Sequence, residues 1–141
     1  MKKRLKKIQI YNDLYDVYMI FLIGGEVEDL QRYISRKHGR NAKLYSWGKP
    51  FDLYAKDANT TNGYQFHVNA PLGKGEVFYS WHHEHTPYMI GHESFHIIGD
   101  IMYNRGVTYN SGSEESFAYL FGWVFAKLFK KLGGKLPKRL V

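Results

Sequence analysis

The feature that most limits how this chain can fold is the pentapeptide His92-Glu93-Ser94-Phe95-His96. Two histidines four residues apart share a face only if the segment is helical, because an α-helix repeats every 3.6 residues. Thr86 followed by Pro87 is typical of a helix start, with Thr as the N-cap and Pro at the first helical position. The sequence therefore predicts a helix from this start to about Asn104, ended by Gly106.

The same spacing predicts a metal site. On one helix face the imidazoles of His92 and His96 can both reach one ion at about 2.0–2.1 Å, with Glu93 beside it. The chain has no cysteine, so a transition-metal site must use His, Asp or Glu. His92 and His96 are therefore candidate ligands. Glu93 is the candidate general base for a water bound to the ion.

An open site of this kind needs a third protein ligand, with one position left for water or substrate. Glu115 is the expected ligand, because it follows His96 after 18 intervening residues and begins a second helical pattern. Gly122 and Ala126 continue the face of Glu115 with little bulk. Gly99 continues the histidine face of the first helix. We expect these small residues to let the two helices approach closely around one ion.

Glu114 is expected to have a different role from its neighbour Glu115. Ser111 and Glu114 have the spacing of a capping box, which predicts that the second helix begins near Ser111 and that Glu114 caps it. The helical pattern then runs to Gly133-Gly134. Successive helical residues project about 100° apart, so only one of the two glutamates can face the histidines.

The segment ahead of these helices predicts a small mixed sheet. Tyr15 to Ile23 is apolar on both alternations, as is typical of a strand covered on both faces. The other expected elements are a helix over Glu26 to His38 ended by Gly39, short strands at Leu44-Tyr45 and Phe51 to Tyr54, and a β-hairpin that pairs Tyr64 to Asn69 with Val77 to His82. The chain thus reads as a single α+β domain.

Net charge adds a competing interpretation. The formal charge is +7, which raises nucleic acid as a partner, but much of it lies in basic tails, Met1 to Lys7 and the lysines and arginine from Lys127 to Arg139. No recognition motif accompanies this charge, so nucleic acid is the weaker expectation. No apolar run is long enough to cross a bilayer and no signal-peptide pattern is complete, which favours a soluble cytoplasmic protein without membrane partners.

The carboxyl-terminal half resembles the gluzincin class of zinc metallopeptidases, in which HExxH is followed 18 or more residues later by a glutamate on the next helix. Glu115-Ser116-Phe117-Ala118 is similar to the Glu-Gly-Phe-Ala stretch of the zinc aminopeptidases, and the ending Glu-Glu-x-Phe-Ala-Tyr is similar to that of small phage or prophage proteins. The resemblance covers about Thr86 to Trp123. It implies a minimal zincin-like domain in which His92, His96 and Glu115 bind Zn²⁺ and Glu93 is the general base.

The function that follows is a zinc-dependent hydrolase, with a peptide or protein as the expected substrate. By the same resemblance, strand Glu76 to Trp81 occupies the place of the edge strand that lines the cleft in zincins, and a free edge can align an extended peptide. His85, within the cluster His82-His83-Glu84-His85, together with Tyr103 and Tyr109, are candidates for stabilising the oxyanion. The cluster itself is expected to be an exposed loop. A zinc-stabilised binding module without turnover is the alternative, which the intact Glu93 argues against.

Overall fold

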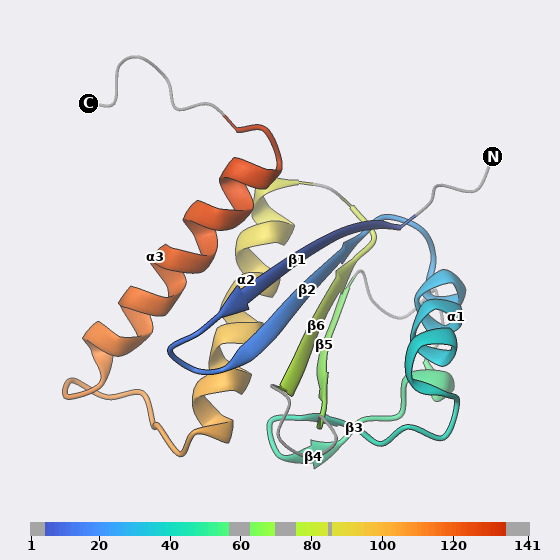
Figure 1. Cartoon of the computed structure of the whole chain (residues 1–141), viewed down its shortest axis with the longest axis horizontal. Coiled ribbons are helices and arrows are strands. Elements are labelled where there is room, and N and C mark those ends of the chain that lie inside the picture. Colours follow the sequence, from blue (N-terminus) through green and yellow to red (C-terminus); the bar gives the residue numbers. More distant parts are fainter. Residues whose placement is uncertain (1–4, 57–62, 70–75, 85, 135–141) are drawn as a thin grey trace.

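The structure is a computed structural model that describes residues 5–56, 63–69, 76–84 and 86–134. In these ranges a six-stranded sheet lies between helix α1 on one face and helices α2 and α3 on the other (Figure 1). This confirms the α+β class. The strands are β1 (Lys6–Asn12), β2 (Val17–Ile23), β3 (Leu44–Ser46), β4 (Lys49–Pro50), β5 (Gly63–Val68) and β6 (Glu76–His82), and the helices are α1 (Val27–His38), α2 (Pro87–Asn104), α3 (Glu114–Lys131) and a 3-10 turn at Leu53–Ala55.

The strands follow the order β1-β2-β6-β5-β3-β4 across the sheet. β2 and β6 are parallel, with Ile20 opposite Tyr79, and every other neighbouring pair is antiparallel. The predicted β5–β6 hairpin is confirmed, although its turn lies outside the described residues. The expectation that Glu76 to Trp81 forms an edge is wrong, because β6 is paired along its length with β2 on one side and β5 on the other.

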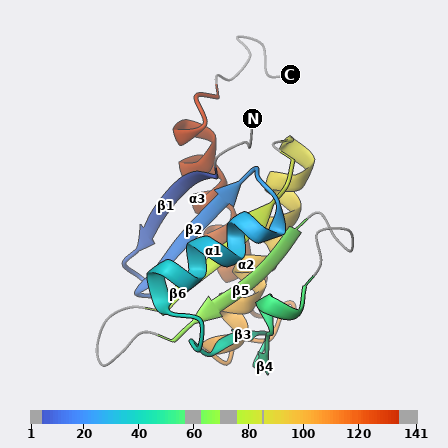
Figure 2. The same cartoon turned by 90° about the vertical axis from the view of Figure 1, so that its right-hand side faces the viewer.

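Two hydrophobic clusters, one on each face of the sheet, form the core. Figure 2 shows α1 in front of the sheet and α2 and α3 behind it. In β2, Met19 and Phe21 face α2 and α3, whereas Ile20 and Leu22 face α1, and all four are buried. The predicted strand covered on both faces is therefore confirmed. In the described ranges, every helix is too short or too polar to cross a membrane.

Sequence reasoning missed two parts of the sheet. Strand β1 begins at Lys6, within the segment expected to be a basic tail, and pairs with β2. The other expected basic tail, after Gly134, lies outside the described residues.

The second missed part of the sheet is β4. The expected strand at Phe51 to Tyr54 is absent, since that stretch holds the 3-10 turn. Its place is taken by β4, which joins β3 through a tight turn where Trp47 (φ 53°) and Gly48 (φ 74°) are both left-handed.

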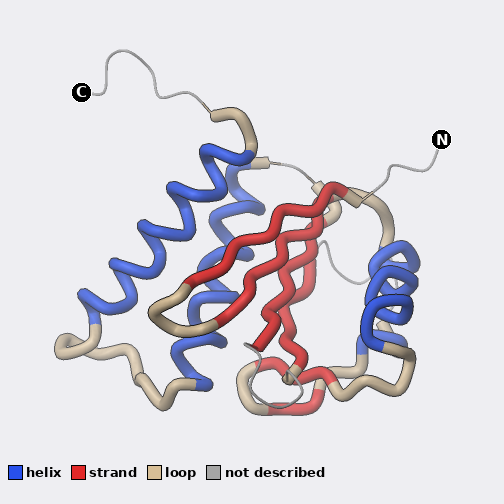
Figure 3. Tube along the Cα trace, in the orientation of Figure 1, coloured by secondary structure: helices blue, strands red, loops and turns tan. Residues whose placement is uncertain are grey.

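A side-chain cap marks the start of α2 but not that of α3 (Figure 3 shows the helices and strands). The Thr86 hydroxyl accepts a 3.2 Å hydrogen bond from the Met89 backbone N–H, so the predicted start of α2 is confirmed. The Ser111–Glu114 capping box is wrong. The N-cap of α3 is Ser113. In the loop before it, Asn110 Oδ1 accepts hydrogen bonds from the backbone N–H groups of Gly112 and Ser113.

Candidate metal site

The two histidines of the HExxH segment lie together on α2. His92 Nε2 and His96 Nε2 are 3.1 Å apart, with ring centroids 4.7 Å apart. The side chain of His92 is 45% exposed and that of His96 is half-buried, so both nitrogens are within reach of solvent. Burial and the neighbouring His92 lower the pKa of His96, which favours the neutral imidazole that a metal requires.

This spacing fits a single metal ion. Two nitrogens at about 2.0–2.1 Å from a tetrahedral ion lie roughly 3.3–3.4 Å apart, close to the separation of the two Nε2 atoms. Neutral imidazole is a favoured ligand of Zn²⁺, and the spacing arises from the helix itself. The pair can therefore supply two ligands of a zinc site.

Glu93 lies beside this pair but points into the protein. Its Oε1 is 3.9 Å from His92 Nε2, and its side chain is 6% exposed. Burial raises the pKa of Glu93 to about 7. A Cβ atom built on Gly63, at the start of β5, would lie only 2.5 Å from Glu93 Oε1. The carboxyl group therefore occupies space that glycine leaves open, and its pKa suits proton transfer near neutral pH.

Glu115 is not grouped with the histidines. It lies in the first turn of α3 and is exposed, on the side of the helix opposite to the buried Leu120 and Val124. Glu114 instead lines a hollow together with Phe95 of α2. Across the described ranges, no three side chains of His, Cys, Asp or Glu are grouped as ligands of one ion. The assignment of Glu115 as third ligand stays a prediction.

The small residues do not bring the helices together in the expected way. Gly122 and Ala126 lie on the exposed side of α3. A Cβ atom on Gly99 would lie 2.4 Å from the Trp47 indole, so it is Trp47, at the β3–β4 turn, that packs against Gly99. The expectation that Gly99 accommodates the second helix is therefore wrong.

The candidates for oxyanion stabilisation are dispersed. Tyr103 and Tyr109 are 53% and 61% exposed and line a pocket beside α2. Tyr103 is two helical turns beyond His96, about 10 Å along the axis. His85 lies outside the described residues. In the loop cluster, His82 is buried at the end of β6, whereas His83 is exposed and its Nδ1 lies 2.6 Å from the Gly25 carbonyl oxygen.

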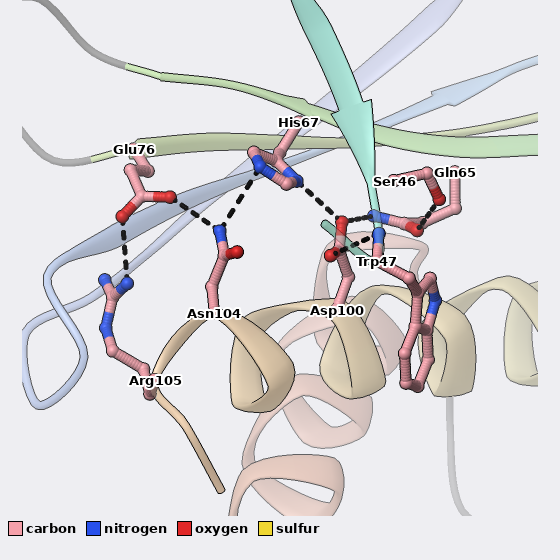
Figure 4. A network of polar contacts seen from close by, with 8 residues as sticks. All are labelled: Ser46, Trp47, Gln65, His67, Glu76, Asp100, Asn104 and Arg105. Carbon is pink, nitrogen blue, oxygen red and sulfur yellow. Dashed lines mark hydrogen bonds and ion pairs between the residues drawn. The ribbon is translucent and has the colours of Figure 1, made fainter. Parts of the chain in front are cut away.

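A buried carboxylate that sequence reasoning missed fixes α2 to the sheet. Asp100 stands one turn after His96 and is completely buried. It accepts hydrogen bonds from the Trp47 backbone N–H (2.9 Å), from Gln65 Nε2 (2.6 Å) and from His67 Nδ1 (2.8 Å) (Figure 4). The helix that carries the histidine pair is thereby tied to the β3–β4 turn and to β5.

The polar network continues toward the end of α2. The Asn104 amide lies 3.2 Å from His67 Nε2 and donates a 2.9 Å hydrogen bond to Glu76, and Arg105 also pairs with Glu76 at 2.9 Å (Figure 4). With Nδ1–H donating to Asp100 and Nε2 accepting from Asn104, both ring nitrogens of His67 are satisfied. This network sets the orientation of α2, with His67 and Asp100 buried and the Glu76–Arg105 pair partly exposed.

A comparison with family models finds no match to this chain, and comparisons with curated proteins and with solved structures find none either. The HExxH motif and the geometry of α2 are therefore the features of this chain that point to a function.

Proposed function

We propose that this chain is a zinc-dependent hydrolase that acts on peptides, with His92 and His96 as zinc ligands and Glu93 as general base. The observation that carries the proposal is the 3.1 Å separation of the two Nε2 atoms beside a buried carboxyl group. A peptide substrate is favoured by the resemblance to the gluzincins. Glu115 is the proposed third protein ligand.

Zinc bound there would lower the pKa of a water molecule to about 7 and polarise a carbonyl group. Glu93 would take the proton of that water on its carboxylate and deliver it to the leaving amine. Gly63 leaves the space that the carboxyl group of Glu93 occupies, and burial keeps the pKa of this group within reach of both proton transfers. A structural zinc site has no use for a buried, proton-exchanging glutamate beside its ligands.

Zinc uptake by protein purified without added metal tests the site. One zinc per chain is expected, and His96→Ala should lose most of it. His83→Ala is the matched control, because His83 is exposed and lies apart from the pair. A parent chain that takes up no added zinc contradicts the proposal.

Turnover is tested separately, with a mixture of unstructured peptides and the zinc-loaded protein. Cleavage by the parent and none by Glu93→Gln, with zinc content unchanged, is the expected result. Zinc uptake without cleavage of any peptide would leave the binding module as the function.

A further inference from the structure

A pocket of about 560 Å³ lies beside α2, where the β3–β4 turn meets the loop between α2 and α3. This volume is within the range of ligand-binding pockets, roughly 300–1,000 Å³. All nine residues that line it are uncharged, and five are aromatic. The aromatic residues are Trp47, Phe95, Tyr103, Tyr109 and Phe117.

One wall of the pocket is held rigidly by α2. The indole of Trp47 lies against Gly99, where any side chain would collide with it, and the Trp47 backbone N–H is bonded to Asp100. The ring of Tyr103 covers Gly48, the next residue of the turn, and its centroid lies 5.9 Å from that of Trp47. Contacts on both sides of the turn thus fix an indole that is still 42% exposed.

A second wall comes from the loop after α2 and from Phe117 of α3, with Phe95 of α2 also in the lining. Tyr109 packs edge-on against Phe117, with ring centroids 5.1 Å apart, and it is 61% exposed. Phe95 is 62% exposed. The pocket therefore presents several aromatic faces that the side chains of residues 5–56, 63–69, 76–84 and 86–134 leave exposed.

The pocket begins within one helical turn of the histidine pair. Phe95 directly precedes His96, and Gly99 follows His96 by three residues on the same side of α2. When the peptide bond to be cleaved lies at His92 and His96, a side chain next to that bond can reach the pocket. Adjacent residues of an extended chain are only about 3.3–3.6 Å apart.

We propose that this pocket binds a large aromatic side chain of the substrate and so makes the hydrolase prefer peptides with an aromatic residue beside the cleaved bond. The inference rests on the proposed function. Aromatic rings gain apolar burial and edge or offset contacts with the lining rings. A lysine or aspartate side chain would lose hydration there without finding an opposite charge.

Binding is measured first, in the presence of chelator, so that no metal is needed. The probes are N-acetyl-phenylalaninamide, N-acetyl-alaninamide and N-acetyl-lysinamide, and the signal is tryptophan fluorescence together with NMR shifts. We expect the phenylalanine probe to bind about tenfold more tightly than the other two. Equal affinities for the three probes would overturn the proposal.

Variants then locate the binding. Trp47→Ala and Tyr109→Ala, one from each wall, should each weaken the phenylalanine probe about fivefold or more. Trp123→Phe is the control, because Trp123 lies on α3 outside the pocket. The Lys127 ammonium lies over its ring in a cation–π contact. Tyr109 is exposed, so its variant stays informative if Trp47→Ala folds poorly. Unchanged affinity in folded Tyr109→Ala would contradict the assignment.

Cleavage by the zinc-loaded protein separates this proposal from the proposed function. Aromatic binding without cleavage of any peptide would remove the hydrolase and leave an aromatic-binding pocket. Cleavage without preference for aromatic residues, in a protein that binds all three probes equally, would remove the pocket proposal alone.

Discussion

The backbone N–H of Trp47 donates a 2.9 Å hydrogen bond to Oδ1 of Asp100, so a left-handed turn residue and a buried helical carboxylate hold each other in place. Trp47 adopts φ 53°, which is uncommon for a bulky residue. The bond joins the wall of the aromatic pocket to the helix that carries the histidine pair. Displacing Trp47 or Asp100 should therefore disturb both the pocket and the position of α2.

Asp100→Asn should destabilise the fold strongly. The amide would turn an N–H group toward Gln65 or His67, which both donate to Oδ2 in the parent. A buried donor left without an acceptor costs about 1–3 kcal/mol. Urea unfolding should show a loss of at least that size, whereas Asp13→Asn, at an exposed position, should change stability by less than about 0.5 kcal/mol. Equal stabilities would show that the network contributes little.

Glu93→Gln should change how stability depends on pH. Burial raises the pKa of Glu93 from 4.5 to about 7. Between these values the folded parent keeps a proton that the unfolded chain has released, so its free energy of unfolding falls as pH rises. The variant has no such proton to release. Its free energy of unfolding, measured relative to that of the parent, should therefore be about 3 kcal/mol higher above pH 7 than below pH 4.5.

Urea unfolding of parent and variant in chelator, from below pH 4.5 to above pH 7, measures this difference. His96, whose pKa is lowered, is present in both proteins, so its contribution cancels in the comparison. Glu28→Gln, at an exposed position of α1, is the control. A difference between Glu93→Gln and the parent that stays constant with pH would contradict the burial argument.

The third ligand is tested by neighbouring substitutions. Glu115→Ala should weaken zinc binding at least about tenfold, because the predicted site loses one of three protein ligands. Glu114→Ala should keep its zinc. Titration of both variants with zinc is the measurement. The reverse result would move the ligand to Glu114, which lines the hollow beside Phe95, and retention by both would remove the gluzincin ligand set.

Gly63→Ala should reduce hydrolysis more than zinc affinity. The added methyl group would lie 2.5 Å from Glu93 Oε1 and 2.9 Å from the Trp81 backbone oxygen, so the carboxyl group must shift. Overpacking of this kind costs about 1–3 kcal/mol of stability. Gly122→Ala is the control, because a Cβ there meets nothing within 4 Å. Parental rates and stability in Gly63→Ala would show that Glu93 needs no such space.

Local signals predicted much of this structure from the sequence. The bounds of α2 and the convergence of His92 with His96 follow from an N-cap, a proline and an i, i+4 spacing within one helix. Strand β2 was predicted because both of its alternations are apolar. These features depend on residues that are close together in the chain.

The parts that were missed depend on distant partners. No local pattern in the sequence marks Asp100 as a structural residue. Its partners Trp47, Gln65 and His67 come from three separate positions, and sheet pairing sets their register. The left-handed conformation of Trp47 has no sequence signal, since Trp does not favour it. The edge position expected for β6 is wrong because β2, which is far from β6 in the chain, pairs along the side that β5 leaves open.

The central β2–β6 pairing also orders the assembly of the fold. β1–β2 and β5–β6 are antiparallel neighbours in sequence, whereas the parallel contact between β2 and β6 joins segments far apart in the chain. Loop-closure entropy therefore favours two early hairpins that dock late. Until they dock, the apolar inner strands Val17–Ile23 and Glu76–His82 each present an unpaired edge. Aggregation during refolding should therefore start from the unpaired edges of these two strands.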